Sequence, residues 1–285
     1  MASEPHPVAL VDHDDAAPGD GPAVDGDAVR RGAEPAPVGD GPSVDGAVDG
    51  GDAPTGTSTA VGTVRGRGAR KKTGSASRGR RLFQHDRALG VRWVVGADEA
   101  GRGCLAGPLV AGAVLFDLER IGPQEVRALG ALDDSKAHTA EERERLFAVV
   151  LRIAERVGSV SRCVEGLDGR GLHVTNLEAL STAARRVARP GALCLTDGFR
   201  VPDTGFDQRH VVGGDAKSAA IAAASIVAKV TRDRFMHRAA ARLPAWGFDQ
   251  HMGYGTTAHQ DAIRRHGLSE LHRRSFRAVA YEGWL

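Results

Sequence analysis

Aromatic residues and cysteines are scarce in this chain of 285 residues: aromatics make up 5% and there are 3 cysteines. Cys104, Cys163 and Cys194 lie far apart and form no Cys-x-x-Cys pair, so nothing suggests a zinc site or a redox couple, and we expect reduced thiols in or near the core. No segment approaches the roughly 18 to 20 consecutive apolar residues of a membrane span, and the N-terminus does not resemble a signal peptide. The sequence therefore predicts a soluble, cytoplasmic protein.

Several common catalytic motifs are also missing. Gly213-Gly-Asp-Ala-Lys-Ser218 looks like the end of a P-loop, but Ala216 stands where that motif requires glycine before the lysine. No Gly-x-Ser-x-Gly elbow occurs, and no His/Cys set has the spacing of a zinc site. We interpret the histidines after His251 as a basic surface: His259, His266 and His272. A nucleotide triphosphatase is therefore disfavoured.

Charge is distributed unevenly along the chain, although the net charge is only +2. Residues 1–60 carry twelve acidic residues against Arg30 and Arg31, whereas residues 61–81 carry eight basic residues and no acidic one. A near-neutral total thus hides two N-terminal segments of opposite charge.

The first 80 residues have the composition of a disordered segment. Asp, Gly, Pro and Ala dominate them, and the stretch 19–26 recurs almost unchanged at 39–46. A repeat this short and polar cannot bury a hydrophobic face. We therefore predict a disordered low-complexity extension over residues 1–80, acidic in 1–60 and basic in 61–81, followed by a folded domain over 88–285. The basic part either binds phosphates non-specifically or is a solvated linker.

Strand and helix patterns alternate in the remainder of the chain. Val91–Ala97 and Leu109–Phe116 read as strands joined by a glycine-rich turn, which predicts an antiparallel pair. Thr139 and Glu142 form a capping box for an amphipathic helix that ends near Val157. Further elements are expected at 159–164 (strand), 176–187 (helix), 192–195 (strand) and 216–240 (helix). This alternation predicts an α/β layer structure.

Acidic residues follow the first predicted strand. Asp98 and Glu99 are neighbours, and neighbours in a regular strand point to opposite faces, so a shared site requires a bend. The glycines of Ala100-Gly-Arg-Gly103 make such a bend easy. An acidic turn at the surface is the alternative.

Two further carboxylates lie at strand ends. Asp197 follows a short buried strand, at the end where open α/β sheets bind ligands, although Asp197-Gly198 is also a common turn. Asp215 precedes the alanine-rich helix and could be its N-cap. Three strand ends that each deliver a carboxylate next to glycine favour a common site. Hard oxygen ligands of this kind prefer Mg²⁺ or Mn²⁺.

Lys217 and Ser218 fall in the first turn of the alanine-rich helix. Together with the free N–H groups of that turn they would attract an anion. The combination suggests chemistry in which a metal ion acts beside a phosphate.

The order and spacing of several motifs over roughly Val91–Arg277 resemble bacterial ribonuclease HII. One departure is Ala137, where that family often has a second lysine. The matching motifs are Gly96-Ala-Asp-Glu-Ala-Gly-Arg-Gly103, Ala106-Gly-Pro108, Asp134-Ser-Lys136, Asp197-Gly198, Gly214-Asp-Ala-Lys-Ser218, Ile221-Ala-Ala-Ala-Ser225, Ala228-Lys-Val-Thr-Arg-Asp233, Gly253-Tyr-Gly-Thr256 and His272-Arg-Arg-Ser-Phe276.

The resemblance implies a ribonuclease H-like mixed sheet flanked by helices, with a helical C-terminal region from about residue 240. It also implies a monomeric, Mn²⁺- or Mg²⁺-dependent endonuclease whose partners are RNA/DNA hybrids and ribonucleotide-containing duplex DNA. Such an enzyme cuts on the 5′ side of a single embedded ribonucleotide and leaves a 3′-hydroxyl and a 5′-phosphate.

Site residues follow from the matching motifs. The resemblance implies metal binding and catalysis by four carboxylates: Asp98, Glu99, Asp197 and Asp215. It implies substrate contacts of three kinds: the ribonucleotide and its 2′-hydroxyl at Gly101, Arg102 and Gly103, the next deoxyribose at Tyr254, and phosphates at Lys136, Lys217 and Ser218.

Two other functions stay open at this point. A non-catalytic module that binds duplex nucleic acid would use the basic run and the arginine-rich C-terminus, and would bind tightly at low salt without turnover. A broader metal-dependent nuclease would ignore the sugar. Only an enzyme that reads the 2′-hydroxyl can separate RNA from DNA at one position.

Overall fold

The computed structural model describes residues 10–12, 72–132, 138–202, 204–276 and 278–285. Most of the predicted extension, together with Lys136 and Ala137, lies outside these residues, so its disorder stays a prediction. Lys72–Arg87 nevertheless forms helix α1, which begins well before position 88. No described helix combines the length and hydropathy that a membrane crossing requires.

A six-stranded mixed sheet forms the centre of the fold, in the order β1-β4-β3-β2-β5-β6. The predicted antiparallel pair is confirmed, since β2 runs against β3. β3 also runs against β4, a pairing that was not predicted. β5 is parallel to both β2 and β6, and β1 is parallel to β4. The strands are β1 (Leu10–Asp12), β2 (Trp93–Ala100), β3 (Leu109–Asp117), β4 (Arg156–Arg162), β5 (Leu193–Asp197) and β6 (Gln208–Val211).

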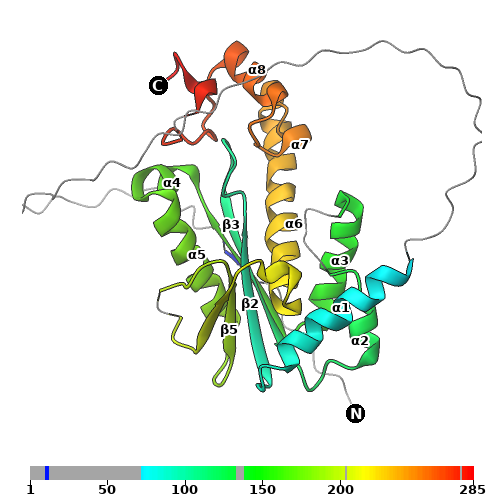
Figure 1. The fold of residues 1–285 in the computed structure, drawn as a ribbon. Helices are drawn as coiled ribbons and strands as arrows, with labels where there is room; N and C mark the ends of the chain where they lie inside the picture. The colour runs from blue at the N-terminus through cyan, green and yellow to red at the C-terminus, as the bar shows by residue number, and fades with distance from the viewer. Residues whose placement is uncertain (1–9, 13–71, 133–137, 203, 277) are drawn as a thin grey trace, which may run out of the picture. The chain divides into compact units, whose positions relative to one another are not determined.

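Helices cover both faces of the sheet (Figure 1). One face packs against α6, α3 and α1, and the other packs against α5. The capping box predicted at Thr139 and Glu142 is present at the start of α3, which ends at Ile153 because β4 begins three residues later. The helices of the two layers are α1 (Lys72–Arg87), α2 (Pro123–Ala128), α3 (Ala140–Ile153), α4 (Val164–Arg170), α5 (Leu172–Val187) and α6 (Ala219–Arg242).

Helix α6 lies unusually close to the sheet. A Cβ atom at Gly96 of β2 would come within 2.0 Å of the Ala220 backbone, and one at Gly112 of β3 would come within 2.5 Å of the Ala224 carbonyl. Glycine on the strands and alanine on the helix therefore allow backbone-to-backbone contact. This contact determines which α6 side chains reach the end of the sheet.

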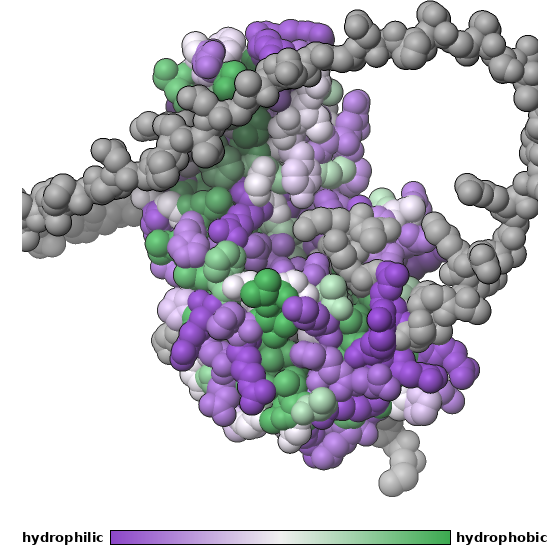
Figure 2. Space-filling view, viewed as in Figure 1, coloured by the Kyte–Doolittle hydropathy of each residue, from purple (hydrophilic) through white to green (hydrophobic). Residues whose placement is uncertain are grey.

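Helix α1 is tied to the N-terminus of α6. Asp86 is fully buried, and its carboxylate accepts a 3.0 Å hydrogen bond from the N–H of Ala220. Leu82 and Phe83 are buried in the same core. The arginines of the basic run that fall on α1, Arg78, Arg80 and Arg81, are exposed, and the surface over α1 and α2 is mainly hydrophilic (Figure 2).

The C-terminal region is helical, as the resemblance implied. It comprises the 3₁₀ turns η3 (Pro244–Trp246) and η4 (Val279–Tyr281) and the helices α7 (Phe248–His251) and α8 (Thr257–His266). Its core joins Phe248 to Ala106 and to Met236 of α6. The three cysteines are free: Cys104 and Cys194 are buried as expected, but Cys163 is exposed.

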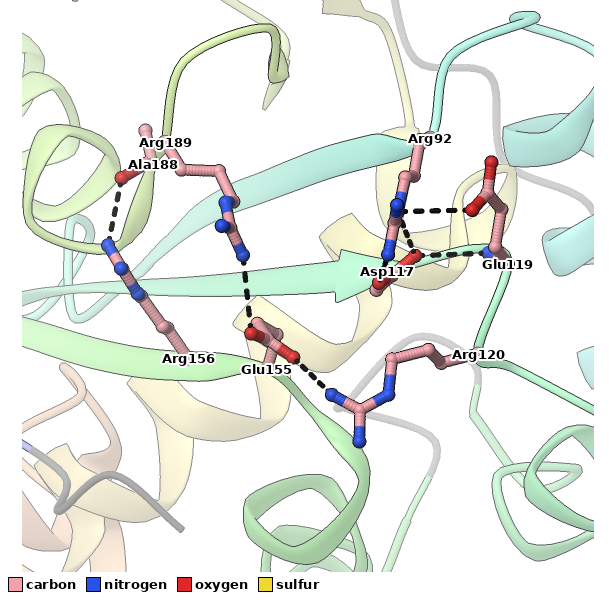
Figure 3. Close-up of polar contacts among 8 residues, drawn as sticks. All are labelled: Arg92, Asp117, Glu119, Arg120, Glu155, Arg156, Ala188 and Arg189. Atoms are coloured by element: carbon pink, nitrogen blue, oxygen red, sulfur yellow. Dashed lines mark hydrogen bonds and ion pairs between the residues drawn. The ribbon is translucent and has the colours of Figure 1, made fainter. Parts of the chain in front are cut away.

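Charged residues gather at the other end of β2 and β3, where β2 begins (Figure 3). Arg92 contacts Asp117 at 2.8 Å, and Glu155 contacts both Arg120 and Arg189, at 3.1 and 3.3 Å. Solvent screens ion pairs of such exposed arginines, so they contribute little to stability. These pairs lie near Trp93, at the end of β2 opposite to Asp98 and Glu99.

Candidate active site

A cavity of about 300 Å³ lies where β2 leaves the side of β5. The β2–β5 pairing ends at Ala97 and Thr196, so the residues of β2 beyond Ala97 have one open edge. Eight of the predicted site residues line the cavity, together with three others. Its lining is Asp98, Glu99, Ala100, Gly101, Arg102, Gly103, Asp197, Asp215, Ser225, Lys229 and Tyr254.

Asp98 and Glu99 lie inside β2, and the strand continues through them without the bend expected at this pair. Their pairing with Gly112 and Ala111 of β3 continues to the end of the strand. Asp98 is 7% exposed, and its carboxylate accepts a 2.8 Å hydrogen bond from the Glu99 N–H. Burial, followed by the charge of Glu99, raises the pKa of Asp98 to about 8. A nearby cation would strongly stabilise the charged form of a carboxylate in such surroundings.

Asp197 and Asp215 are brought together by one hydrogen bond. Asp197 ends β5, and its Oδ1 accepts from the N–H of Gly214 at 2.7 Å. Gly214 opens the 3₁₀ turn η2 (Gly214–Ala216), which carries Asp215. The N-cap of α6 is Ser218, so Asp215 is not that helix's cap.

Ser225 and Lys229 of α6 complete the cavity, and the sequence argument gave neither of them a role. Ser225 hydrogen-bonds Asp98 and opposes the rise in its pKa. The Lys229 ammonium contacts Asp233 at 2.7 Å. The three residues recur at intervals of four, which places them on one helix face. That spacing could have revealed them, had the strands that α6 crosses been known.

The segment Gly101–Gly103 forms a turn over the cavity. Gly101 has φ +89°, and a Cβ atom there would come within 2.0 Å of the Arg232 side chain. The Arg102 guanidinium lies 3.8 Å from Glu99 and stacks on the ring of Phe199, 4.7 Å from its centroid. Gly103 has no atom within 4 Å of the position that a Cβ would take. The turn therefore leaves its tip open to a ligand.

Tyr254 reaches the cavity from the loop after α7. The preceding residue, Gly253, has φ +79°, and its carbonyl accepts from the N–H groups of Leu105 and Ala106. Tyr254 is 39% exposed, and burial of the remainder raises its pKa. Its ring therefore offers a half-exposed aromatic surface beside the carboxylates.

Two of the three predicted phosphate contacts, Lys217 and Ser218, are not part of this cavity. The Lys217 ammonium donates to the Val212 carbonyl at 2.7 Å on the exposed surface. Ser218 is fully buried, and its hydroxyl accepts from the Ile221 N–H as the helix cap. Lys136 lies outside the described residues.

The interpretation of the late histidines as a basic surface is wrong for two of them. His259 and His272 are buried with His251, and only His266 is exposed. The Nε2 atoms of His259 and His272 are 3.1 Å apart, and His259 Nδ1 donates to the Tyr254 carbonyl at 2.9 Å. Burial lowers the pKa of His259 to about 4 and that of His272 to about 3.

The donor set of the cavity fits divalent cations. It offers four carboxylates and the hydroxyls of Ser225 and Tyr254, all hard oxygen donors. Within the described ranges no three His, Cys, Asp or Glu side chains form a tight metal-binding group. Carboxylates that face one another repel, and a cation between them removes that repulsion. The walls of the cavity therefore offer the oxygen ligands that a divalent cation requires.

The comparisons with known proteins decide the family. The family model described as Ribonuclease HII matches residues 95–279. The chain belongs to the ribonuclease HII family. The ribonuclease HII of Geobacillus kaustophilus (strain HTA426) is 43% identical over 201 residues, which cover 70% of this chain and 74% of that protein. A ribonuclease HII is a ribonuclease H-type endoribonuclease that acts on RNA/DNA hybrids and on embedded ribonucleotides, and its activity depends on a divalent metal.

Solved structures agree on the ribonuclease H-like fold. The ribonuclease H2 of Pyrococcus horikoshii OT3 is 25% identical with a TM-score of 0.55, and the match covers 65% of this chain and 94% of that one. Bst-RNase HIII in complex with Mn²⁺ is 18% identical with a TM-score of 0.51, over 74% of this chain and 73% of that one, which shows the fold alone. The expected ribonuclease H-like sheet is confirmed.

Proposed function

We propose that this ribonuclease HII incises duplex DNA on the 5′ side of an embedded ribonucleotide. Water adds to phosphorus and the bond to the preceding O3′ breaks, leaving a 3′-hydroxyl and a 5′-phosphate. The supporting observation is that four carboxylates, the Gly101–Gly103 turn and Tyr254 line one cavity. A site for hydrolysis thus adjoins a site that can read the sugar.

In this proposal the four carboxylates Asp98, Glu99, Asp197 and Asp215 hold Mn²⁺ or Mg²⁺. Such ions lower the pKa of the attacking water and neutralise charge on the leaving oxygen. Ser225 fixes the carboxylate of Asp98 by its hydrogen bond. Lys229 adds positive charge to a wall that would otherwise repel a phosphodiester.

Selectivity for RNA comes from the 2′-hydroxyl, which is the group that a ribonucleotide adds to the backbone. We assign its recognition to Gly101, Arg102 and Gly103, because the open tip at Gly103 permits close approach. Tyr254 packs against the following sugar, where a deoxyribose leaves room for the ring. All of these residues come from a single chain, which supports a monomer. We further propose that the protein acts in the cytoplasm, on the basis of its DNA substrate.

Three matched duplexes test the proposal: all-DNA, DNA with one ribonucleotide, and an RNA/DNA hybrid, each with Mg²⁺, with Mn²⁺ and with a chelator. We expect metal-dependent cutting of the second and third, with a single cut on the 5′ side of the ribonucleotide. Equal cutting of the all-DNA duplex would indicate a nuclease that ignores the sugar. Tight binding without cutting in any metal would indicate a binding module. Sedimentation of the full chain tests the monomer.

A further inference from the structure

Two arginines are buried without a counter-ion beneath the cavity turn. Arg232 and Arg273 are both fully buried, and within the described residues neither has a carboxylate at ion-pair distance. Burial and the charge of Arg232 lower the pKa of Arg273 to about 10, so it remains a cation at neutral pH. Burying an unpaired cation is costly unless its nitrogens find hydrogen-bond partners, and the Nε, Nη1 and Nη2 atoms of both guanidiniums find them. Here they donate to backbone carbonyls.

The two guanidiniums hold different parts of the site. Arg232 donates to the carbonyls of Ala106, Pro108 and Met252. It therefore joins the segment just before β3 to the loop that carries Tyr254. Arg273 donates twice to the Gly107 carbonyl, at 2.8 and 3.0 Å. Its Nη1 donates to the Arg102 carbonyl at 3.0 Å. Arg273 therefore reaches into the turn that faces the substrate.

Within this turn, the central Arg102–Gly103 peptide makes no hydrogen bond to another residue of the turn. The N–H of Cys104 donates to the Gly101 carbonyl at 3.3 Å, which closes a four-residue β-turn. The central peptide of a β-turn can rotate by about half a turn, which interconverts type I and type II, and type II requires a positive φ at the third residue. Glycine at that position permits both forms. Gly103 does not have a positive φ here.

The hydrogen bond from Arg273 selects one of the two orientations. A trans peptide points its C=O and its N–H in opposite directions. Because the Arg102 carbonyl points inward to a buried guanidinium, the Gly103 N–H points away from it. Gly103 is exposed, and in the described part of the chain no protein group accepts a hydrogen bond from its N–H. The turn thus presents a donor to the cavity.

We propose that Arg273 is a positioning residue for ribose recognition: by holding the Arg102 carbonyl, it keeps the Gly103 N–H directed at the sugar-phosphate next to the scissile bond. This inference rests on the proposed function of the same turn. With the peptide reversed, the turn would present a carbonyl oxygen to a phosphate-rich ligand. Selectivity for the ribonucleotide, and not only affinity for the duplex, therefore depends on Arg273.

The test uses Arg273→Gln and Arg273→Lys in the full chain. Lysine keeps the charge but lacks the planar guanidinium, whose separate nitrogens bond the carbonyls of Arg102 and Gly107. Tyr281→Phe is the control, because it removes a 2.8 Å hydrogen bond to the Leu105 carbonyl in the same loop. The backbone N–H of Arg273 still donates to that carbonyl. Melting temperatures are measured for all three variants. The readouts are KM for the single-ribonucleotide duplex and Ki for the matched all-DNA duplex as a competitor.

For both Arg273 variants we expect KM to rise about tenfold with Ki unchanged, so that the ratio Ki/KM falls about tenfold; Tyr281→Phe keeps the wild-type ratio. An unchanged ratio in Arg273 variants that fold, including an equal rise of KM and Ki, overturns the proposal. If wild type cuts neither ribonucleotide substrate, the proposed function fails instead.

A measurement on the chain with Arg273 intact covers the case in which both Arg273 variants fail to fold. In ¹⁵N-glycine-labelled Asp215→Asn protein, the amide signal of Gly103, assigned through Gly103→Ala, should move downfield with the ribonucleotide duplex and not with the all-DNA duplex. The same response to both duplexes, or none to either, overturns the proposal.

Discussion

Oδ1 of Asp197 lies 2.7 Å from the backbone nitrogen of Gly214 and accepts its hydrogen bond. The bond joins the end of β5 to the turn that carries Asp215. Gly214 fits tightly there, since a Cβ would come within 2.4 Å of Ile221 and 3.4 Å of the Asp197 carboxylate. One carboxylate therefore has a structural task as well as its proposed ligand role: it determines where the next carboxylate stands.

We expect Asp215→Asn to lower kcat for ribonucleotide incision by at least about 10³-fold, while the melting temperature changes little. The residue is partly exposed in η2 and is not the cap of α6, so the fold loses little. The amide keeps the shape of the side chain but loses the charge that would bind the metal. Activity in saturating Mg²⁺, thermal melting and duplex affinity are the measurements. Near-normal turnover would show that Asp215 does not ligate the metal.

Two truncations should differ sharply in stability. Removal of residues 1–71 is expected to leave the melting temperature nearly unchanged, because this segment has little apolar content and β1 pairs over only three residue pairs with β4. Removal of residues 1–87 also deletes the buried Leu82, Phe83 and Asp86. Removal of each large buried side chain lowers the free energy of unfolding by about 2–5 kcal/mol, so the shorter chain should unfold at a far lower urea concentration. Equal urea midpoints for the two truncations would contradict this assignment of α1.

Two neighbouring glycines should behave oppositely when changed to alanine. Gly101→Ala forces a positive φ on alanine and pushes its Cβ against Arg232, so we expect a loss of more than about 1 kcal/mol in stability. Gly103→Ala meets no atom within 4 Å and should fold normally. If substrate approaches this turn closely, Gly103→Ala will nevertheless lower kcat/KM about tenfold or more. Unaltered kinetics for Gly103→Ala would remove the turn from the substrate interface.

Tyr254→Ala should affect junctions more than continuous RNA. A ring that packs on the following deoxyribose contributes when that sugar lacks a 2′-hydroxyl, as it does after a single embedded ribonucleotide. We expect kcat/KM to fall several-fold more on the single-ribonucleotide duplex than on the RNA/DNA hybrid. The two substrates are compared for wild type and variant under one set of salt conditions. Identical losses on both would leave Tyr254 as a packing residue only.

The buried histidines predict a loss of stability in acid. The folded chain resists protonation of His259 and His272 until pH values near 4 and 3, whereas the unfolded chain takes up these protons near the ordinary histidine pKa of about 6.5. Their contribution is complete above about pH 7 and disappears as pH falls from about 6.5 towards 3, by a few kcal/mol in total. Urea unfolding at pH 7, 5 and 4 measures it. His259→Asn should show a flatter dependence, and an equal slope would contradict the assignment.

Local patterns predicted most elements of the sheet and its helices. The Thr139 cap and the antiparallel β2–β3 pair depend on neighbouring residues or a short turn, and both are present. Asp98 and Glu99 were found, but their place inside the strand was not, because pairing with β3 depends on residues ten or more positions away. The resemblance to a family, and not composition, brought Tyr254 into the site.

The residues whose roles the sequence did not reveal depend on tertiary contacts. Ser225 lies within a run of alanines, and the sequence does not show which face of this helix packs on the sheet. The close approach of α6 to Gly112 reveals that face. Asp86 belongs to a basic, polar helix, and its buried role appears only through the Ala220 N–H. Histidines carry no periodic signal that separates a surface from a core. Their burial follows from the packing of α7 and α8 around Phe248.

Each ring of the histidine cluster has a fixed tautomer. His251 accepts from the Gly253 N–H and donates to Trp246, while His272 accepts from the Ser269 N–H and so donates to His259. An added proton would face another donor at each accepting nitrogen. These three rings therefore stay neutral at physiological pH and release no counterions when nucleic acid binds. These three rings should therefore contribute nothing to the salt dependence of duplex affinity.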